Sequence, residues 1–121
     1  ALMLANDEEV IFSPDSDPKE AQYIPTGFTA VTRAPFEALS KELPYCHQGW
    51  GHTAFWPFYQ PYVIPWPGED QNIYLSEDWA FCQRAVDAGF KCWGDPSVRV
   101  GHSGSYMYTL EDLLRADRVI E

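Results

Sequence analysis

The sequence has few positive charges and no long apolar run. Eight Lys and Arg residues stand against eighteen Asp and Glu residues, which gives a formal net charge of −10. Nucleic acids and anionic membranes are bound through clustered cations, so this balance argues against both as partners. Every apolar stretch is shorter than the roughly 20 residues that a membrane-spanning helix needs. We therefore expect no nucleic-acid partner and no transmembrane segment.

Cysteine is also scarce. Cys46, Cys82 and Cys92 are odd in number and lack the compact spacing of a disulfide framework. Such usage suits a reducing compartment with buried thiols, so we expect a cytoplasmic protein in which Cys82 and Cys92 are core residues. Cys46, His47 and His52 could instead bind zinc in a small interaction module, although no second pair of ligands follows at zinc-finger spacing.

The chain has enough apolar residues for one core. Its 121 residues are 45% hydrophobic and 16% aromatic, so we predict a single domain over residues 1–121. The pattern predicts a strand over residues 23–32, broken at a Pro and a Gly, and a short helix over residues 34–42. Later segments predict a helix after Ser76, strands over residues 90–93 and 98–102, and a final capped helix from Thr109. This mixture indicates an α/β fold.

The predicted helix after Ser76 carries the most informative acidic residues. Ser76 can cap it, Glu77 and Asp78 suit the positive end of its dipole, and Gly89 ends it. Its apolar stripe is formed by Phe81, Cys82, Ala85, Val86 and Gly89. Asp78 lies on the side of this stripe, where a carboxylate needs a partner, a cleft or a raised pKa. Asp78 is therefore either a base with Glu77 beside it, or a first-turn acid satisfied by backbone N–H groups.

Residues 43–67 combine many aromatic rings with several prolines. They have no sustained period, so we predict an ordered but irregular loop. We expect its part from His47 to Trp66 to form one wall of a cleft opposite the start of the Ser76 helix. Sugars present C–H faces that stack on aromatic rings, which makes Trp50, Trp56 and Trp66 candidates for an acceptor platform. Large rings also supply core area in a small domain. We expect most of these rings in the core and one or two in binding.

His102 ends the second predicted strand and is followed by small residues that leave its ring accessible. An imidazole in this position can bind a divalent metal or a phosphate. The end of a strand and the start of a helix often meet at the ligand-binding edge of an α/β layer, so we expect His102 near Asp78 at one end of the sheet. Metal sites need several converging ligands, so a structural role for His102 stays open as the alternative.

Several linked motifs resemble the C-terminal half of GT-A glycosyltransferases. They are S-E-D-W-A-F-C-Q-R at residues 76–84, A-G-F at 88–90, D-P at 95–96 and G-H at 101–102, preceded by T-G-F-T-A-V-T-R at 26–33. The match runs from about residue 23 to 114 and is similar to family 2 and to small bacterial and phage-type members. The resemblance implies a partial GT-A-like, three-layer α/β/α domain with a mixed sheet and a long aromatic loop.

The resemblance also implies roles for individual residues. Asp78 would be the base that deprotonates the acceptor hydroxyl, with Glu77 beside it in acceptor binding. Thr26 and Gly27 would line the donor sugar site, where glycine permits close backbone approach. His102 would complete the coordination of Mn²⁺ or Mg²⁺, which offsets the diphosphate charge of the leaving group.

One departure from the family concerns its nucleotide-binding half, which has no counterpart in these residues. Asp15-Ser16-Asp17 spells the family's D-x-D metal motif, but two prolines flank it and no apolar strand precedes it. The function implied is hexosyltransferase-type transfer from a nucleotide sugar to a carbohydrate or other hydroxyl acceptor. The alternative is a catalytically silent domain that binds a carbohydrate or a protein.

Overall fold

The computed structural model describes residues 15, 17–51 and 53–112. The described residues divide into two compact units, of which the first contains residues 19–51 and 53–94 and the second contains residues 15, 17–18 and 95–112. In the described part, no helix is both long and apolar enough to cross a bilayer. The single domain over residues 1–121 stays a prediction.

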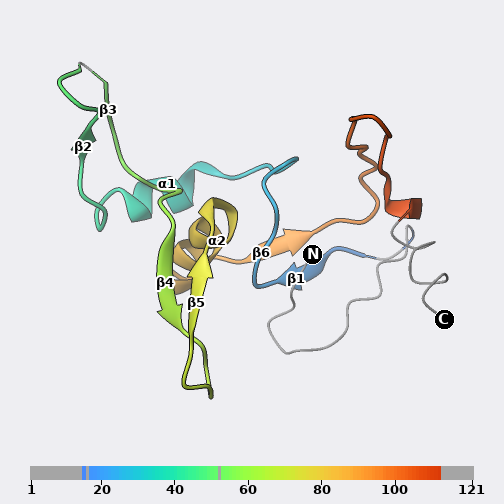
Figure 1. The fold of residues 1–121 in the computed structure, drawn as a ribbon, viewed down its shortest axis with the longest axis horizontal. Coiled ribbons are helices and arrows are strands. Elements are labelled where there is room, and N and C mark those ends of the chain that lie inside the picture. Colours follow the sequence, from blue (N-terminus) through green and yellow to red (C-terminus); the bar gives the residue numbers. More distant parts are fainter. Residues whose placement is uncertain (1–14, 16, 52, 113–121) are drawn as a thin grey trace. The chain divides into compact units, whose positions relative to one another are not determined.

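Helices and small antiparallel sheets make up the first unit (Figure 1). The helices are α1 (Arg33–Leu39) and α2 (Glu77–Asp87); the strands are β1 (Lys19–Ala21), β2 (Cys46–His47), β3 (Ala54–Phe55), β4 (Tyr62–Pro65), β5 (Asn72–Leu75) and β6 (Cys92–Gly94). Antiparallel pairs join β1 to β6, β2 to β3 and β4 to β5. The mixture of helices and strands is confirmed. Among the described residues, however, the strands pair only in twos, and no mixed sheet forms.

The segment that was expected to be irregular contains the β2–β3 hairpin and the first strand of the β4–β5 hairpin. β4 pairs with β5 from Tyr62 opposite Leu75 to Pro65 opposite Asn72, and β2 pairs with β3 over two residues. The turn of the β4–β5 hairpin contains Gly68 at a φ of 78°, a conformation that glycine adopts without strain. The prediction of an irregular loop over residues 43–67 is therefore wrong in part. Strands of two to four residues are too short to show a period of 2 in the sequence.

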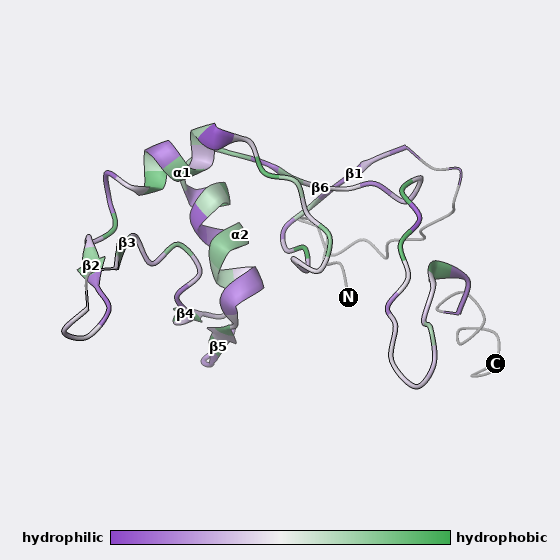
Figure 2. Ribbon diagram, turned by 90° about the horizontal axis from the view of Figure 1, so that it is seen from above, coloured by the Kyte–Doolittle hydropathy of each residue, from purple (hydrophilic) through white to green (hydrophobic). Residues whose placement is uncertain are grey.

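The predicted helix after Ser76 is confirmed as α2. Ser76 occupies the N-cap position, although its hydroxyl makes no capping bond, and Gly89 follows the helix at a φ of 93°. The buried face consists of Ala80, Phe81, Cys82 and Ala85. Val86, which was expected on this face, is exposed at its edge. Figure 2 shows hydrophobic and hydrophilic positions distributed along both helices, as expected for helices with one buried face.

The core of the first unit forms around α2. Its buried members are Tyr23, Leu75, Ala80, Cys82 and Cys92, with half-buried rings and aliphatic chains from β4 and β5 packed against them. The core positions predicted for Cys82 and Cys92 are confirmed. Burial of these side chains is the main favourable term for this unit, at about 25 cal/mol per Å² of apolar surface.

Two predicted elements before residue 43 differ from the structure. Helix α1 begins at Arg33 and ends at Leu39, so it is shorter than the predicted 34–42. The strand predicted over residues 23–32 does not form; β1 precedes it and ends at Ala21. Pro25 has no N–H to donate to a ladder, and the N–H groups of Ile24 and Thr26 bond to side chains of α2 instead.

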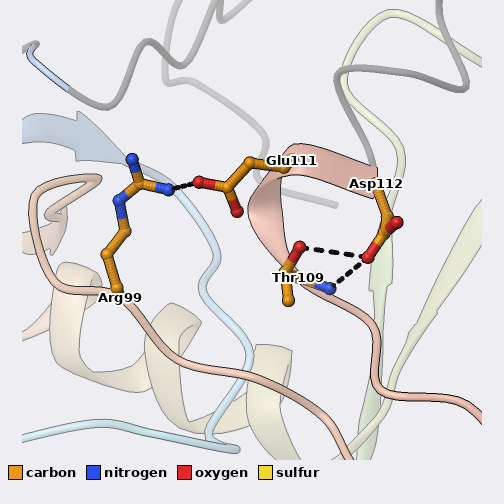
Figure 3. Close-up of polar contacts among 4 residues, drawn as sticks. All are labelled: Arg99, Thr109, Glu111 and Asp112. Atoms are coloured by element: carbon orange, nitrogen blue, oxygen red, sulfur yellow. Dashed lines mark hydrogen bonds and ion pairs between the residues drawn. The ribbon is translucent and has the colours of Figure 1, made fainter.

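The second unit is mostly loop in its described part. The strand predicted over residues 98–102 is reduced to one antiparallel bridge between His102 and Tyr108, because no partner strand continues the ladder. Half of the predicted capping box at Thr109 is confirmed: the Asp112 carboxylate accepts bonds from the Thr109 N–H at 2.8 Å and from its hydroxyl at 3.0 Å (Figure 3). The Asp112 N–H bonds to the Thr109 carbonyl oxygen in place of the hydroxyl. An ion pair between Arg99 and Glu111 ties the loop to this helical turn.

Candidate functional site

Asp78 and Thr26 meet in the structure although 52 residues separate them in the chain. The Thr26 hydroxyl donates to Oδ1 of Asp78 at 2.6 Å, and the Thr26 N–H donates to Oδ2 at 3.3 Å. Asp78 at the start of α2 therefore accepts a hydrogen bond from one backbone N–H. The structural interpretation of Asp78 predicted such a bond, but the N–H belongs to a segment distant in the sequence. The structure thus brings together two of the residues singled out from the sequence.

Further contacts hold residues 23–26 along α2. The Tyr23 hydroxyl donates to Oε1 of Gln83 at 2.5 Å, and the Tyr23 ring stacks on Trp79 with centroids 4.6 Å apart. The Cys82 sulfur accepts from the Ile24 N–H at 3.4 Å and lies 3.6 Å from the Ile24 carbonyl oxygen. Residues 23–26 therefore run antiparallel to α2, and Thr26 at their end contacts Asp78.

The surroundings of Asp78 leave room for a ligand. Asp78 is half-buried, and its neighbours Glu77 and Gly27 are exposed. No protein atom lies within 4 Å of the position that a Cβ on Gly27 would take. A carboxylate has about four lone-pair positions, so the two bonds from Thr26 leave acceptor capacity on Asp78. The geometry permits a hydroxyl group to reach this carboxylate from solvent.

Aromatic rings connect α2 to the β2–β3 hairpin. Phe81 on α2 stacks with Phe36 on α1 at 5.3 Å and with Tyr59 at 4.6 Å between centroids. Phe58 packs edge-on against Phe36 at 5.0 Å, and Trp56 lies 6.3 Å from Phe58. Phe81 is the buried member of this group, so the network leads from the core to the surface.

A hollow of about 490 Å³ opens beside this network. It is lined by Cys46, Phe55, Trp56, Pro57, Phe58, Tyr59 and Gln60. Its volume falls in the range of small-molecule sites, and such sites are lined mainly by apolar and aromatic groups. The expectation that some rings of the aromatic segment are exposed is confirmed at Trp50, Phe55, Trp56, Tyr59 and Trp66. The expectation that most of these rings lie in the core is wrong, because Phe58 and Tyr62 are only half-buried.

Tyr59 lines the hollow and stacks on Phe81 of α2. Burial raises the pKa of Tyr59, and the nearby charges of Cys82 and Asp78 raise it further. The phenol therefore keeps its proton and can donate a hydrogen bond to a ligand in the hollow. The sequence did not single out Tyr59, because the stretch P-F-Y-Q-P shows no periodicity that would assign its ring to one side.

The three tryptophans proposed as a platform occupy different places. Trp50 is fully exposed in the turn between β2 and β3, whereas Trp66 begins the turn between β4 and β5. Figure 1 shows these two turns well apart. Trp56 alone lines the hollow, where it also packs on Tyr45 with centroids 4.7 Å apart. A ligand in the hollow would therefore contact Trp56 among the three.

His102 lies in the second unit, where it is exposed and bridged to Tyr108 by two backbone bonds of 2.8 Å. Asp78 belongs to the first unit, so the expected proximity of His102 to Asp78 stays a prediction. Over residues 15, 17–51 and 53–112, no three side chains of His, Cys, Asp or Glu gather closely enough to hold a metal ion. The described residues therefore do not form a complete site for Mn²⁺ or Mg²⁺.

The zinc alternative gains no support from β2. Cys46 and His47 are consecutive residues of that strand, and consecutive side chains of a strand point to opposite faces. The Cys46 sulfur lies 3.4 Å from the carbonyl oxygen of Pro44, and the His47 ring packs edge-on against Tyr45. The third residue of the set, His52, lies outside the described residues.

No protein-family model, curated protein or solved structure matches this chain. The glycosyltransferase family therefore stays a resemblance carried by the motifs of residues 26–33 and 76–102.

Proposed function

We propose that the protein takes part in sugar transfer from a nucleotide sugar to a hydroxyl acceptor, with Asp78 as the general base. The observation that carries this proposal is the contact between Asp78 and Thr26, since the family resemblance gives these two residues adjoining roles. A GT-A-like fold and a cytoplasmic setting belong to the same proposal. Three free cysteines support that setting.

In this proposal the acceptor sugar binds at the hollow, where Trp56 and Tyr59 offer ring faces for its C–H groups. The acceptor hydroxyl reaches Asp78, which takes its proton as the hydroxyl oxygen attacks the donor sugar and the nucleoside diphosphate leaves. Thr26 fixes the orientation of the carboxylate through its two bonds. Glu77, exposed beside it, contributes to acceptor binding, and the open space next to Gly27 belongs to the donor sugar.

A bound Mn²⁺ or Mg²⁺ would offset the negative charge of the leaving diphosphate. His102 is the residue of this chain proposed as a ligand, and further ligands have to come from the diphosphate or from other groups. Because the described residues form no complete metal site, no step of the proposed reaction is routed through the metal.

A second candidate function is carbohydrate binding without catalysis. It is favoured by one specific observation: both carboxylate oxygens of Asp78 are already hydrogen-bonded to Thr26. In this case Asp78 is a structural clamp between α2 and residues 23–26, while the exposed aromatic rings bind the sugar.

Calorimetric titration of the full-length protein with nucleoside diphosphates, with and without Mn²⁺, distinguishes the two functions. Transfer predicts metal-dependent nucleotide affinity that Asp78→Asn retains, because the base acts on the acceptor side. Asp70→Asn is a matched control, since Asp70 is exposed in the turn of the β4–β5 hairpin. Failure of every nucleoside diphosphate to bind, together with glycan binding that Trp56→Ala abolishes, would establish the silent binding domain instead.

A further inference from the structure

The hollow beside the aromatic network has an uncharged and mainly apolar lining. Among the described residues that line it, none carries a charge at neutral pH, and the polar side-chain groups are the Cys46 thiol, the Tyr59 hydroxyl and the Gln60 amide. A sugar buried there would place several hydroxyl groups against apolar ring faces, where they lose their hydrogen bonds to water. The hollow is therefore suited to an apolar group, and a sugar attached to that group would stay at the rim.

Two rings of the hollow are supported from behind and exposed in front. Tyr59 stacks one face on the buried Phe81, with centroids 4.6 Å apart and planes 20° apart. Because Tyr59 is nevertheless 38% exposed, its free surface is the opposite face and the edge of the ring. Trp56 packs on Tyr45 in the same way and is 39% exposed. Rings that are already held in place need little ordering when a ligand stacks on them, which favours binding.

The charges around the hollow favour a neutral ligand. Phe58 lines the hollow, and its carbonyl oxygen accepts a hydrogen bond from the Arg84 guanidinium at 3.0 Å. This positive charge next to a lining residue disfavours an organic cation, which the ring faces alone would attract. The net charge of −10 on the whole chain disfavours an anion.

We propose that the hollow binds a neutral aromatic group, and that the acceptor is an aryl glycoside with its aromatic ring in the hollow and its sugar at the rim. A flat ring that stacks on Trp56 and Tyr59 gains more than an aliphatic group of equal size gains from burial alone. Phe81 lies three residues after Asp78 on α2, so in the transfer the sugar extends from the Tyr59 edge of the hollow along this helix toward Asp78. The acceptor role depends on the proposed function, whereas binding of the aromatic group does not.

The test is calorimetric titration of the full-length protein with phenyl, cyclohexyl and methyl β-glucoside, in the absence of nucleotide and metal. The phenyl glucoside should bind about fivefold or more tighter than the cyclohexyl glucoside, and the methyl glucoside should bind most weakly. Phenol compared with cyclohexanol repeats the measurement without any sugar. Trp56→Ala should remove the preference for the phenyl group. Trp66→Ala is the matched control and should keep it, because Trp66 is exposed to a similar degree, at 45%, but does not line the hollow.

A second measurement locates the ligand without relying on a variant. Cys46 lines the hollow and is partly exposed, whereas Cys82 and Cys92 are buried. Phenyl β-glucoside at ten times its Kd should slow the alkylation of Cys46 by iodoacetamide about tenfold, because the occupied hollow excludes the reagent. Methyl β-glucoside at the same concentration should leave the rate almost unchanged. Peptide mass spectrometry gives the rate for each cysteine separately.

Three results would overturn the inference. The first is no binding of the phenyl compounds, or equal affinity for phenyl and cyclohexyl compounds. The second is unchanged alkylation of Cys46 while phenyl β-glucoside is bound, which would place the ligand elsewhere. The third is tighter binding of phenyltrimethylammonium than of phenol, which would make the hollow a cation site. Since these titrations contain no nucleotide, a failure of sugar transfer would contradict the acceptor role and leave the binding of the aromatic group standing.

Discussion

A double-mutant cycle on Asp78 and Thr26 tests the contact at the centre of the site. Thr26→Val keeps the shape and backbone N–H of Thr26 but removes the hydroxyl bond of 2.6 Å. Hydrogen bonds to a charged group contribute about 1.5–3 kcal/mol when buried, and Asp78 is half-buried, so we expect a loss of about 1.5 kcal/mol in the free energy of unfolding. Asp78→Ala also loses the longer N–H bond and should cost about 2 kcal/mol.

The cycle isolates the interaction between the two side chains. The double variant should be less destabilised than the sum of the single variants by about 1 kcal/mol, measured by urea unfolding with an unchanged dependence on urea. Asp78→Asn should lower the free energy of unfolding by about 1 kcal/mol. The side-chain carbonyl oxygen of Asn can still accept the bond from the Thr26 hydroxyl, but its NH₂ group would face the Thr26 N–H, which also donates. Additive losses within about 0.3 kcal/mol would show that the two side chains do not interact, and would refute this reasoning.

Three further predictions concern α2 and its ends. Gly89→Ala should destabilise the protein by about 1 kcal/mol, because a φ of 93° strains any residue with a Cβ; thermal unfolding measures this, and an unchanged melting temperature would contradict the left-handed geometry. Ser76→Ala should change the free energy of unfolding by less than about 0.5 kcal/mol, since its hydroxyl makes no capping bond; a loss of 1 kcal/mol or more would mean that the hydroxyl does cap the helix. Alkylation of Cys82 by a small reagent in Cys46→Ser should be faster above pH 7 than below it, because the thiolate is the reactive form and the Cys82 pKa is lowered to about 7; a midpoint near pH 9 would contradict this lowered pKa.

The sequence predicted α2 correctly because the signals for this helix are local. An acidic first turn, an apolar stripe and a glycine with positive φ all lie within residues 76–89, and the structure has the helix there. The capping box at Thr109 is equally local. Local patterns of this kind depend on residues three or four positions apart, so one sequence is sufficient to recognise them.

The strands could not be predicted in the same way because strand pairing is not local. Nothing near residues 19–21 indicates that they pair with residues 92–94, and nothing near residue 98 indicates that a partner strand is missing. The same limit applies to the site. The sequence identified Asp78 and Thr26 as separate candidates, but only the fold shows that they are bonded and that Tyr59 stacks on Phe81 of the same helix.

The measurement that tests the proposed function most directly is release of nucleoside diphosphate from a panel of nucleotide sugars, with carbohydrate acceptors present and Mn²⁺ supplied. Wild-type full-length protein should release a nucleoside diphosphate from at least one donor. Asp78→Asn should do so about 100-fold more slowly while still folded and binding the nucleotide, since general-base catalysis contributes roughly this factor. Equal rates in wild type and Asp78→Asn, or no release from any donor by the folded wild-type protein, would contradict Asp78 as the base of a sugar transfer.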